Sequence, residues 1–304
     1  MVKVHLHAEV AAALRDGHAV VALESSVLAQ GLPEPSNREA DRRMRAAIRE
    51  RGAVPAVTAV VRGVPVAGLE GADLARFLAR SGIPKVSARD IPWAMARGSD
   101  GATTVAAALC ICAISGIPVL ATGGIGGVHR PFSGSALDES ADLLELSRSS
   151  VVTVCAGAKS ILDLSATVER LETLGVTVIG FRTEEFPGFL TAHTGLRVSA
   201  AADSAADIAR TFLANRALGR PGAVLVVQPP PPAVALDARL VEMAVDAAVA
   251  AASSAGISGS RLTPFLLAEV ERATGGRSLA ANLGLLEANA ALAAEIAVAL
   301  TDSR

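Results

Sequence analysis

Short apolar runs rich in β-branched residues alternate with longer amphipathic stretches along most of the chain. A run of about 4–8 apolar residues bounded by turn residues is typical of a buried strand, whereas apolar positions three and four apart indicate a helix. The alternation predicts an α/β fold, a three-layer α/β/α sandwich with a mixed, mostly parallel central sheet. We expect strands near residues 20–25, 56–61, 118–124, 151–157, 176–181 and 223–228, and helices near 36–51, 103–115, 160–173 and 203–218.

The turn at Arg62-Gly63 and the C-terminal part of the chain add detail to this architecture. Apolar runs on both sides of Arg62-Gly63 predict a hairpin, which makes the sheet mixed. From about residue 235 to 304 the pattern is helical, and we expect these helices to pack on the sheet. Residues 1–304 are therefore predicted to form a single domain.

The stretch from Gly101 to Val128 contains no charged residue and is long enough to cross a bilayer. It is interrupted by Ser115-Gly116 and by Pro118, which are typical of a helix end followed by a new strand. The stretch therefore predicts a buried helix and a buried strand, and we expect no membrane partner.

Composition narrows the possible partners. With 51% hydrophobic and 19% charged residues the chain is globular, and 28 Lys and Arg against 30 Asp and Glu leave no excess of positive charge. Because aromatic residues make up only 3%, a nucleic acid polymer is not expected as a partner. Cys110, Cys112 and Cys155 form neither a disulfide framework nor a zinc knuckle, and the N-terminus lacks the apolar segment of a signal peptide. We expect a reducing, cytoplasmic location.

Two candidate chemical features follow predicted strands. Glu24 comes directly after the first strand, where it could act as a general acid or cap a backbone amide. The sequence TGGIGG at 122–127 follows another strand, and its glycines let backbone N–H groups approach an anion closely. No glycine opens a helix after it, so the context of a dinucleotide-binding site is missing.

Acidic residues mark the start of a predicted helix near residue 138. Asp138 can cap this helix, and Asp142, four residues later, would then lie on the same face. Oxygen ligands arranged in this way suit Mg²⁺ or Mn²⁺. The alternative is an ordinary capping sequence with acids at the positive end of a helix.

Lys159 stands where the strand at 151–157 is expected to lead into a helix. A lysine at a helix N-terminus opposes the macrodipole, so helix propensity does not explain it. The positive helix end and desolvation would lower its pKa and leave a neutral amine nucleophile. The alternative is an exposed lysine without a special role.

Nine sequence blocks, in order along nearly the whole chain, resemble the pseudouridine-5'-phosphate glycosidase family, also called indigoidine synthase A-like. The resemblance implies a homotrimer that uses Mn²⁺, or Mg²⁺, and reversibly joins ribose 5-phosphate to uracil through a carbon-carbon bond. The blocks are ALESS (22–26), GLPEPSN (31–37), KVSARD (85–90), GATTV (101–105), ATGGIGGVHR (121–130), DESADL (138–143), CAGAKSILD (155–163), TPFLL (263–267) and GGRSLAANLGLLEANA (275–290).

The same resemblance implies roles for individual residues. Glu24 would transfer a proton, Lys159 would form an iminium with C1' of opened ribose, and Asp138 would hold the metal. Asn282 would read the base edge, since an amide offers both a donor and an acceptor. The other expected substrate-binding positions are Lys85, Thr104, Val105, Gly123, Gly124, His129, Ser140, Ala141 and Asp142.

Some positions depart from the family pattern. Ser26 stands where threonine is usual, Pro131 replaces a glycine, the loop at 131–137 is longer, and Glu287-Ala288 precedes Asn289 where an asparagine is often found. We therefore expect a changed lip of the acceptor pocket, and the alternative function is a C-glycosynthase that attaches ribose 5-phosphate to an aromatic natural-product aglycone. A nucleotide-sensing regulatory protein is a distant alternative, since an activated lysine beside a metal has no evident use there.

Overall fold

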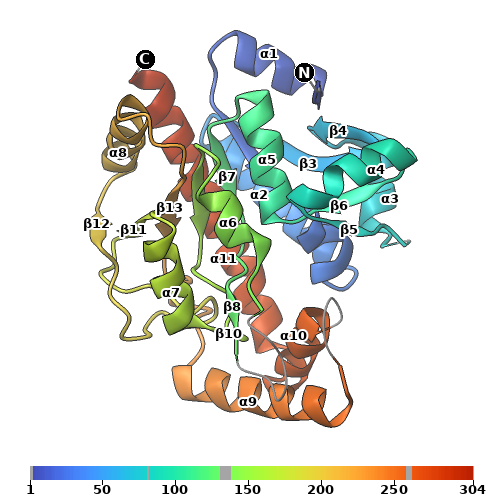
Figure 1. Ribbon diagram of the computed structural model, residues 1–304, viewed down its shortest axis with the longest axis vertical. Helices are drawn as coiled ribbons and strands as arrows, with labels where there is room; N and C mark the ends of the chain where they lie inside the picture. Colours follow the sequence, from blue (N-terminus) through green and yellow to red (C-terminus); the bar gives the residue numbers. More distant parts are fainter. Residues whose placement is uncertain (1–2, 81, 131–137, 258–261, 304) are drawn as a thin grey trace.

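A computed structural model describes residues 3–80, 82–130, 138–257 and 262–303. Its main sheet has the strand order β1-β4-β3-β2-β7-β9-β13-β11-β12, with β6 paired to β3 and β5 paired to β6 (Figure 1). The strands are β1 (His5–Leu6), β2 (Val20–Leu23), β3 (Val54–Val61), β4 (Val64–Ala67), β5 (Lys85–Val86), β6 (Gly101–Thr103), β7 (Val119–Ala121), β9 (Val152–Cys155), β11 (Thr177–Phe181), β12 (Ala200–Ala202) and β13 (Val224–Val227). A separate pair consists of β8 (Val128–His129) and β10 (Leu162–Asp163).

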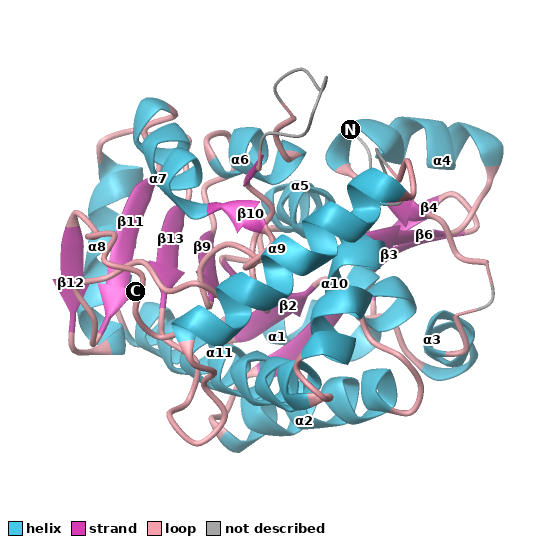
Figure 2. Ribbon diagram, turned by 90° about the horizontal axis from the view of Figure 1, so that it is seen from below, coloured by secondary structure: helices cyan, strands magenta, loops and turns pink. Residues whose placement is uncertain are grey.

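Helices cover both faces of the sheet (Figure 2). Helices α5, α6 and α7 lie on one face, and α2, α8 and α11 lie on the other. The helical segments are α1 (Ala8–Arg15), η1 (Val27–Gly31), α2 (Ser36–Glu50), α3 (Gly71–Leu78), η2 (Ala88–Asp90), α4 (Ile91–Arg97), α5 (Val105–Ser115), α6 (Ala141–Leu146), α7 (Leu164–Thr173), α8 (Ala205–Ala217), α9 (Ala238–Ser254), α10 (Leu262–Ala273) and α11 (Arg277–Asp302). The predicted three-layer sandwich is confirmed.

The centre of the sheet consists of parallel strands that are buried throughout. Every residue of β2, β7, β9 and β13 is buried, and their neighbours pair in parallel. Strands covered on both faces read as continuous apolar runs, which explains why all six predicted strands are found. The predicted hairpin is also confirmed, because β3 pairs antiparallel with β4 across Arg62-Gly63.

Two apolar helices fill the layers on either side. The stretch 101–128 forms β6, α5 and β7, as expected for a buried helix and strand. Among the described helices, α11 alone is long and apolar enough to cross a membrane, but 56% of its most apolar window is buried. It packs against β7, β9 and α2, which is typical of a core helix.

The C-terminal helices take two positions. Helix α11 packs on the sheet as predicted, whereas α9 and α10 pack on each other beyond the ends of the strands (Figure 1). The prediction that residues 235–304 pack on the sheet therefore holds for α11 only. One continuous core of buried apolar residues reaches from Val10 to Leu300.

Two predicted helix starts were wrong, and β8 explains both. Leu162 pairs with His129 of β8, so the helix expected from residue 160 begins only at Leu164. The main-chain N–H of His129 also donates to the carbonyl of Asp138, so Asp138 precedes the next helix, which Ser140 caps instead. Pairing between distant segments has no local sequence signal.

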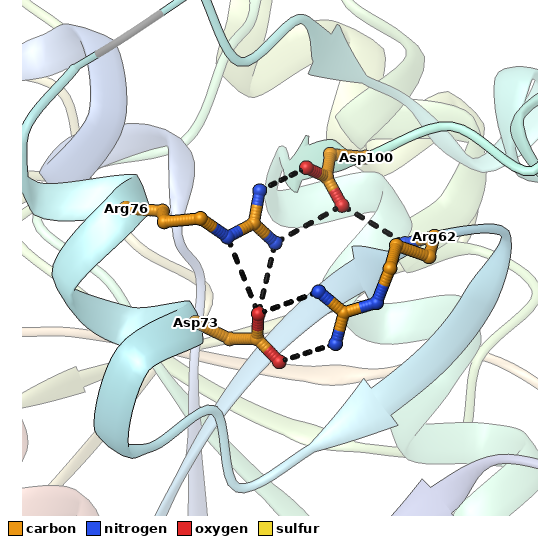
Figure 3. Close-up of polar contacts among 4 residues, drawn as sticks. All are labelled: Arg62, Asp73, Arg76 and Asp100. Carbon is orange, nitrogen blue, oxygen red and sulfur yellow. Dashed lines mark hydrogen bonds and ion pairs between the residues drawn. The ribbon is translucent and has the colours of Figure 1, made fainter.

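A network of four charged side chains joins the β3–β4 turn, α3 and the segment before β6 (Figure 3). Arg62 binds Asp73 through two hydrogen bonds of 3.0 and 2.9 Å. Arg76 donates to Asp73 at 2.9 Å and also to Asp100. The Oδ1 of Asp100 in turn accepts a hydrogen bond of 2.9 Å from the main-chain N–H of Arg62. Asp100 directly precedes β6, and β6 pairs with β5, the strand that begins at Lys85. The network therefore helps to position the strand next to Lys85.

The network is expected to make stability depend on pH below about 4. The hydrogen bond from Arg62 lowers the pKa of Asp73, and that from Arg76 lowers the pKa of Asp100. A carboxylate with a lowered folded pKa stabilises the protein above its unfolded pKa of about 3.9, and this contribution is lost as the pH falls through the folded value. Asp100→Asn should lower the free energy of unfolding at pH 7 by about 1 kcal/mol, since the group is partly exposed. In urea titrations the difference in free energy of unfolding between Asp100→Asn and wild type should shrink below pH 4. An equal difference at pH 3 and pH 7 would contradict the prediction. Asp16→Asn, at an exposed carboxylate, is the control.

Candidate active site

A cavity of about 310 Å³ lies at the carboxyl ends of β2 and β7, between the sheet, α10 and the start of α11. Ligand crevices of open α/β sheets occur at this position. Two of the three lysines in the chain line it, although Lys and Arg together number 28. The predicted site residues in its wall are Glu24, Lys85, Gly123, Gly124, Lys159 and Asn282.

Glu24 follows β2 and is only 6% exposed. Its Oε1 accepts a hydrogen bond of 2.9 Å from the hydroxyl of Thr122, and its Oε2 accepts one from the hydroxyl of Ser26. Both partners are hydroxyl groups, so the side chain caps no backbone amide here. Two hydrogen bonds hold the carboxyl group in one orientation at the cavity wall, which suits proton transfer to a bound ligand.

Lys159 lies in the loop between β9 and β10, and its main-chain N–H donates to Ile125 at 3.1 Å. The next residue, Ser160, donates its hydroxyl hydrogen to the carbonyl of Gly188 at 3.1 Å. The loop is therefore anchored on both sides of the lysine. The prediction that Lys159 begins a helix was wrong, so the helix macrodipole does not act on its amine in the expected way.

Lys85 places a second cationic side chain in the cavity. Solvent reaches it there, yet the surrounding protein partly desolvates its amine and thereby lowers its pKa. The charge of Lys159 lowers this pKa further, while the charges of Glu24 and Asp142 raise it. Two lysine amines that repel each other in one cavity favour a bound anion, which would relieve the repulsion.

The glycine-rich loop is shaped by packing. A side chain at Gly124 would meet Phe189 at 2.7 Å, and one at Gly123 would meet Leu286 at 3.2 Å. Phe189 lines the cavity with a φ of 66°, a conformation that non-glycine residues rarely adopt. Close approach to Phe189 therefore favours glycine at Gly124, whereas a side chain at Gly123 would require Leu286 to shift by only a few tenths of an ångström.

Sequence reasoning assigned no role to Asn289, which holds this loop. Its amide donates to the carbonyls of Thr122 and Gly123 at 2.8 and 3.2 Å, and its oxygen accepts from Gln228 at 2.9 Å. The residue is 1% exposed. A polar side chain within an otherwise apolar helix was the available signal, since buried polar groups need partners.

The other predicted substrate-binding residues lie outside the cavity wall. Thr104 caps α5 and Val105 is its first residue, while His129 belongs to β8. Ser140 caps α6 and Ala141 begins it. The structure therefore brings together six of the predicted site residues and leaves Thr104, Val105, His129, Asp138, Ser140, Ala141 and Asp142 beyond the wall.

Asp142 joins two of these segments. Its two carboxylate oxygens accept the backbone N–H groups of Ala106, at 2.9 Å, and Gly126, at 2.8 Å. The side chain therefore connects the first turn of α5 to the glycine-rich loop. The prediction that Asp138 and Asp142 share a helix face was wrong, because Asp138 precedes α6.

Replacing Asp142 with alanine should destabilise the fold, because a buried N–H of Ala106 and a partly buried one of Gly126 would lose their acceptor. We expect the free energy of unfolding to fall by about 2–4 kcal/mol in urea titrations. Asp138→Ala is the matched control, since this carboxylate is exposed and should change stability by less than about 0.5 kcal/mol. Equal stability of the two variants would contradict the assignment.

The chain offers limited ligands for the predicted divalent ion. The described residues contain no group of three or more His, Cys, Asp or Glu side chains placed to hold a metal. Asp138 is exposed and can supply a carboxylate. Mg²⁺ is commonly held by one or two carboxylates together with water and substrate phosphate, so Asp138 fits as a single protein anchor.

The departures from the family pattern fall in different places. Ser26 lines the cavity and contacts Glu24. Glu287 instead forms a surface ion pair of 3.5 Å with Arg43 and does not line the cavity. Residues 131–137 lie outside the described ranges. Of the four departures, the structure places Ser26 in the wall and Glu287 away from it, and the other two fall within residues 131–137.

Comparison with known proteins identifies the family of this chain. The family model described as indigoidine synthase A like protein matches residues 9–299. The chain belongs to the indigoidine synthase A-like family. This membership confirms the resemblance inferred from the nine sequence blocks.

Relatives within the indigoidine synthase A-like family include named enzymes. A pseudouridine-5'-phosphate glycosidase of Gemmatimonas aurantiaca is 60% identical over 290 residues, 95% of this chain and 94% of that protein. Another from Herpetosiphon aurantiacus is 49% identical over 303 residues and covers both chains completely. The crystal structure of the prealnumycin C-glycosynthase AlnA in complex with ribulose 5-phosphate is 39% identical, with a TM-score of 0.91 over 99% of this chain and 97% of that one.

Proposed function

We propose that the protein makes and breaks a carbon-carbon glycosidic bond between ribose 5-phosphate and uracil, the bond of pseudouridine 5'-phosphate. The observation that carries this proposal is the presence of Lys159, Glu24 and Lys85 in the wall of one cavity. The glycosidases named above, at 60% and 49% identity over nearly the whole chain, support it.

A carbon-carbon glycosidic bond requires an electron sink, because the leaving group has no heteroatom to protonate. In the direction of synthesis, Glu24 moves a proton at the ring oxygen of ribose 5-phosphate and assists ring opening to the aldehyde. The amine of Lys159 then condenses with C1', releasing one water and forming an iminium. The iminium accepts the electron pair of the incoming carbon.

Bond formation then releases the lysine. C5 of uracil attacks C1' of the iminium and loses its proton, so that a carbon-carbon bond replaces a carbon-hydrogen bond. The sugar hydroxyl then displaces the Lys159 amine at C1' and closes the ring. Cleavage of pseudouridine 5'-phosphate runs through the same steps in reverse, in which the C5 proton returns and one water is consumed.

The remaining wall residues bind the substrates. Lys85 neutralises the phosphate, for which its position beside Lys159 is suited. Asn282 contacts the base, because its side-chain oxygen is buried and has no hydrogen-bond partner within the described residues. Thr104, Val105 and the turn at Ser140-Ala141-Asp142 support the sugar phosphate from behind the wall, through the two helix N-termini that they form.

Activity should depend on a divalent ion held by Asp138. When bound, Mn²⁺ or Mg²⁺ would supply positive charge near the phosphate. Chelation with EDTA should therefore reduce the rate of product formation by about tenfold or more, and added Mn²⁺ should restore it. Asp138→Ala should need more Mn²⁺ for half-maximal activity, whereas the exposed Asp16→Ala should not. Full activity of Asp138→Ala in EDTA would exclude this role.

The assembly and location of the protein also belong to the proposal. We propose a homotrimer in the cytoplasm, on the strength of the family resemblance and of the apolar surface of α9. Met243, which is exposed on α9, contributes to this surface.

A second candidate function is a C-glycosynthase for an aromatic aglycone. The likeness to the structure of AlnA favours it, with a TM-score of 0.91. Incubation with ribose 5-phosphate and a panel of uracil and hydroxylated aromatics, followed by mass spectrometry, distinguishes the two. Formation of pseudouridine 5'-phosphate supports the first function, and turnover of aromatics alone supports the second. No product with any acceptor would contradict both.

A further inference from the structure

Gln30, in η1, lines the cavity without a role in the mechanism above. Its Nε2 donates a hydrogen bond of 2.6 Å to the carbonyl of Ile83. This contact fixes the orientation of the amide, because the reverse orientation would place two acceptors against each other. The side-chain Oε1 of Gln30 is therefore an acceptor in a defined position.

This acceptor has no partner in the described part of the chain. Within residues 3–80, 82–130, 138–257 and 262–303, the Oε1 of Gln30 is buried without a hydrogen-bond partner, and the same is true of the Oδ1 of Asn282. Buried acceptors without partners cost free energy and are rare in folded proteins. Two of them on residues that line one cavity indicate a ligand that brings two hydrogen-bond donors.

Resting on the function proposed above, we propose that Gln30 is a specificity residue of the aglycone pocket. Its Oε1 accepts a hydrogen bond from one ring N–H of uracil, and Asn282 contacts the other. A uracil ring joined through C5 keeps both N1–H and N3–H, whereas one joined through N1 has lost a donor. The pocket therefore selects a pyrimidine with two ring donors and disfavours an aromatic that presents carbonyl oxygens at these positions.

The main chain of the same residue is also held. Arg80 donates to the carbonyl of Gln30 at 3.2 Å, so η1 and the segment before Lys85 are joined through Gln30 in both directions. A purely structural role for Gln30 would therefore affect every ligand equally. Selective recognition would affect only ligands that differ at one ring nitrogen, and this difference separates the two roles.

Binding of uracil, 1-methyluracil and 3-methyluracil to the full-length protein tests the proposal. NMR titration in the presence of inorganic phosphate measures affinity without requiring turnover. Wild type should bind each methylated isomer about 10-fold or more weakly than uracil, because a methyl group removes the donor and leaves an acceptor unpaired. Gln30→Met should reduce this penalty to about twofold for one isomer and leave it unchanged for the other.

Two further variants complete the test. Asn282→Leu should relieve the penalty for the other isomer. Arg80→Met keeps the Oε1 of Gln30 and removes the main-chain contact together with one charged side chain of the cavity wall, so it should change the three affinities by one common factor and leave their ratios equal to those of wild type. Three results would overturn the proposal. Gln30→Met could weaken the binding of all three ligands equally, or Gln30→Met and Asn282→Leu could relieve the penalty for the same isomer. The third is that wild type does not bind uracil at millimolar concentration. Selective binding of uracil without its conversion would support Gln30 as the reader and contradict the proposed reaction.

Discussion

Replacing Lys159 with alanine is expected to abolish turnover, lowering the rate of product formation by about 1,000-fold or more. The amine supplies both the nucleophile for C1' and the electron sink for the carbon-carbon bond, and Lys85, the other lysine in the wall, is assigned to the phosphate. Lys159→Arg should fail to the same extent, since a guanidinium remains protonated and has no available lone pair. Initial rates with pseudouridine 5'-phosphate, measured by uracil release, test both variants.

Reductive trapping tests the covalent step directly. Borohydride added during turnover should convert the iminium to a stable secondary amine and inactivate the enzyme. The chain contains only three lysines, Lys3, Lys85 and Lys159, so peptide mapping can assign the added mass without ambiguity. We expect it on Lys159. Mass on Lys85, or normal turnover by Lys159→Ala, would exclude the proposed mechanism.

Glu24→Gln should slow the reaction by about 100-fold or more. Glutamine preserves the size of the side chain, and its oxygen can accept one of the hydrogen bonds from Thr122 and Ser26 while its NH2 group donates to the other hydroxyl, but it cannot transfer a proton. Single-turnover experiments with borohydride should therefore show slow formation of the trapped adduct in this variant, and none in Lys159→Ala.

Thr122→Val provides the matched control for Glu24. It removes one hydrogen bond to the carboxyl group while the proton donor remains, so the expected loss is smaller, about tenfold. A loss in Thr122→Val as large as that in Glu24→Gln would indicate that orientation, rather than proton transfer, limits the reaction. Unchanged trapping rates in Glu24→Gln would exclude its role in ring opening.

Local patterns were sufficient for the central strands of the sheet and for several candidate site residues. Strands such as β2 and β13 are buried along their whole length, so their apolar runs were visible without knowledge of their partners. Glu24 was found because it directly follows a strand, and ligand crevices lie at that end of parallel sheets. The scarcity of lysine was a further available signal, since two of the three lysines line the cavity.

Long-range pairing decided the environment of Lys159 and Asp138. The β8–β10 pair delays the helix after Lys159, and the main-chain contact of Asp138 with His129 displaces it from the cap of α6. Each partner is distant in the chain or lies in a short strand without a periodic pattern, so propensity at these positions pointed to helix. The sequence therefore indicated two candidate residues that the structure retains as candidates, but the helix N-terminus expected at Lys159 is not there.

The sequence by itself determined the α/β class, the order of the central strands and helices along the chain, and the identity of Lys159 and Glu24 as candidates, because these depend on local periodicity and on residue type. Only the tertiary structure decided which candidates share a cavity, that Asp142 accepts hydrogen bonds from two backbone amides, and that the Oε1 of Gln30 finds no partner among the residues that the structure describes. The physical reason is that hydrogen-bond partners and burial are properties of segments brought together by folding, and the identity of a single residue does not contain them.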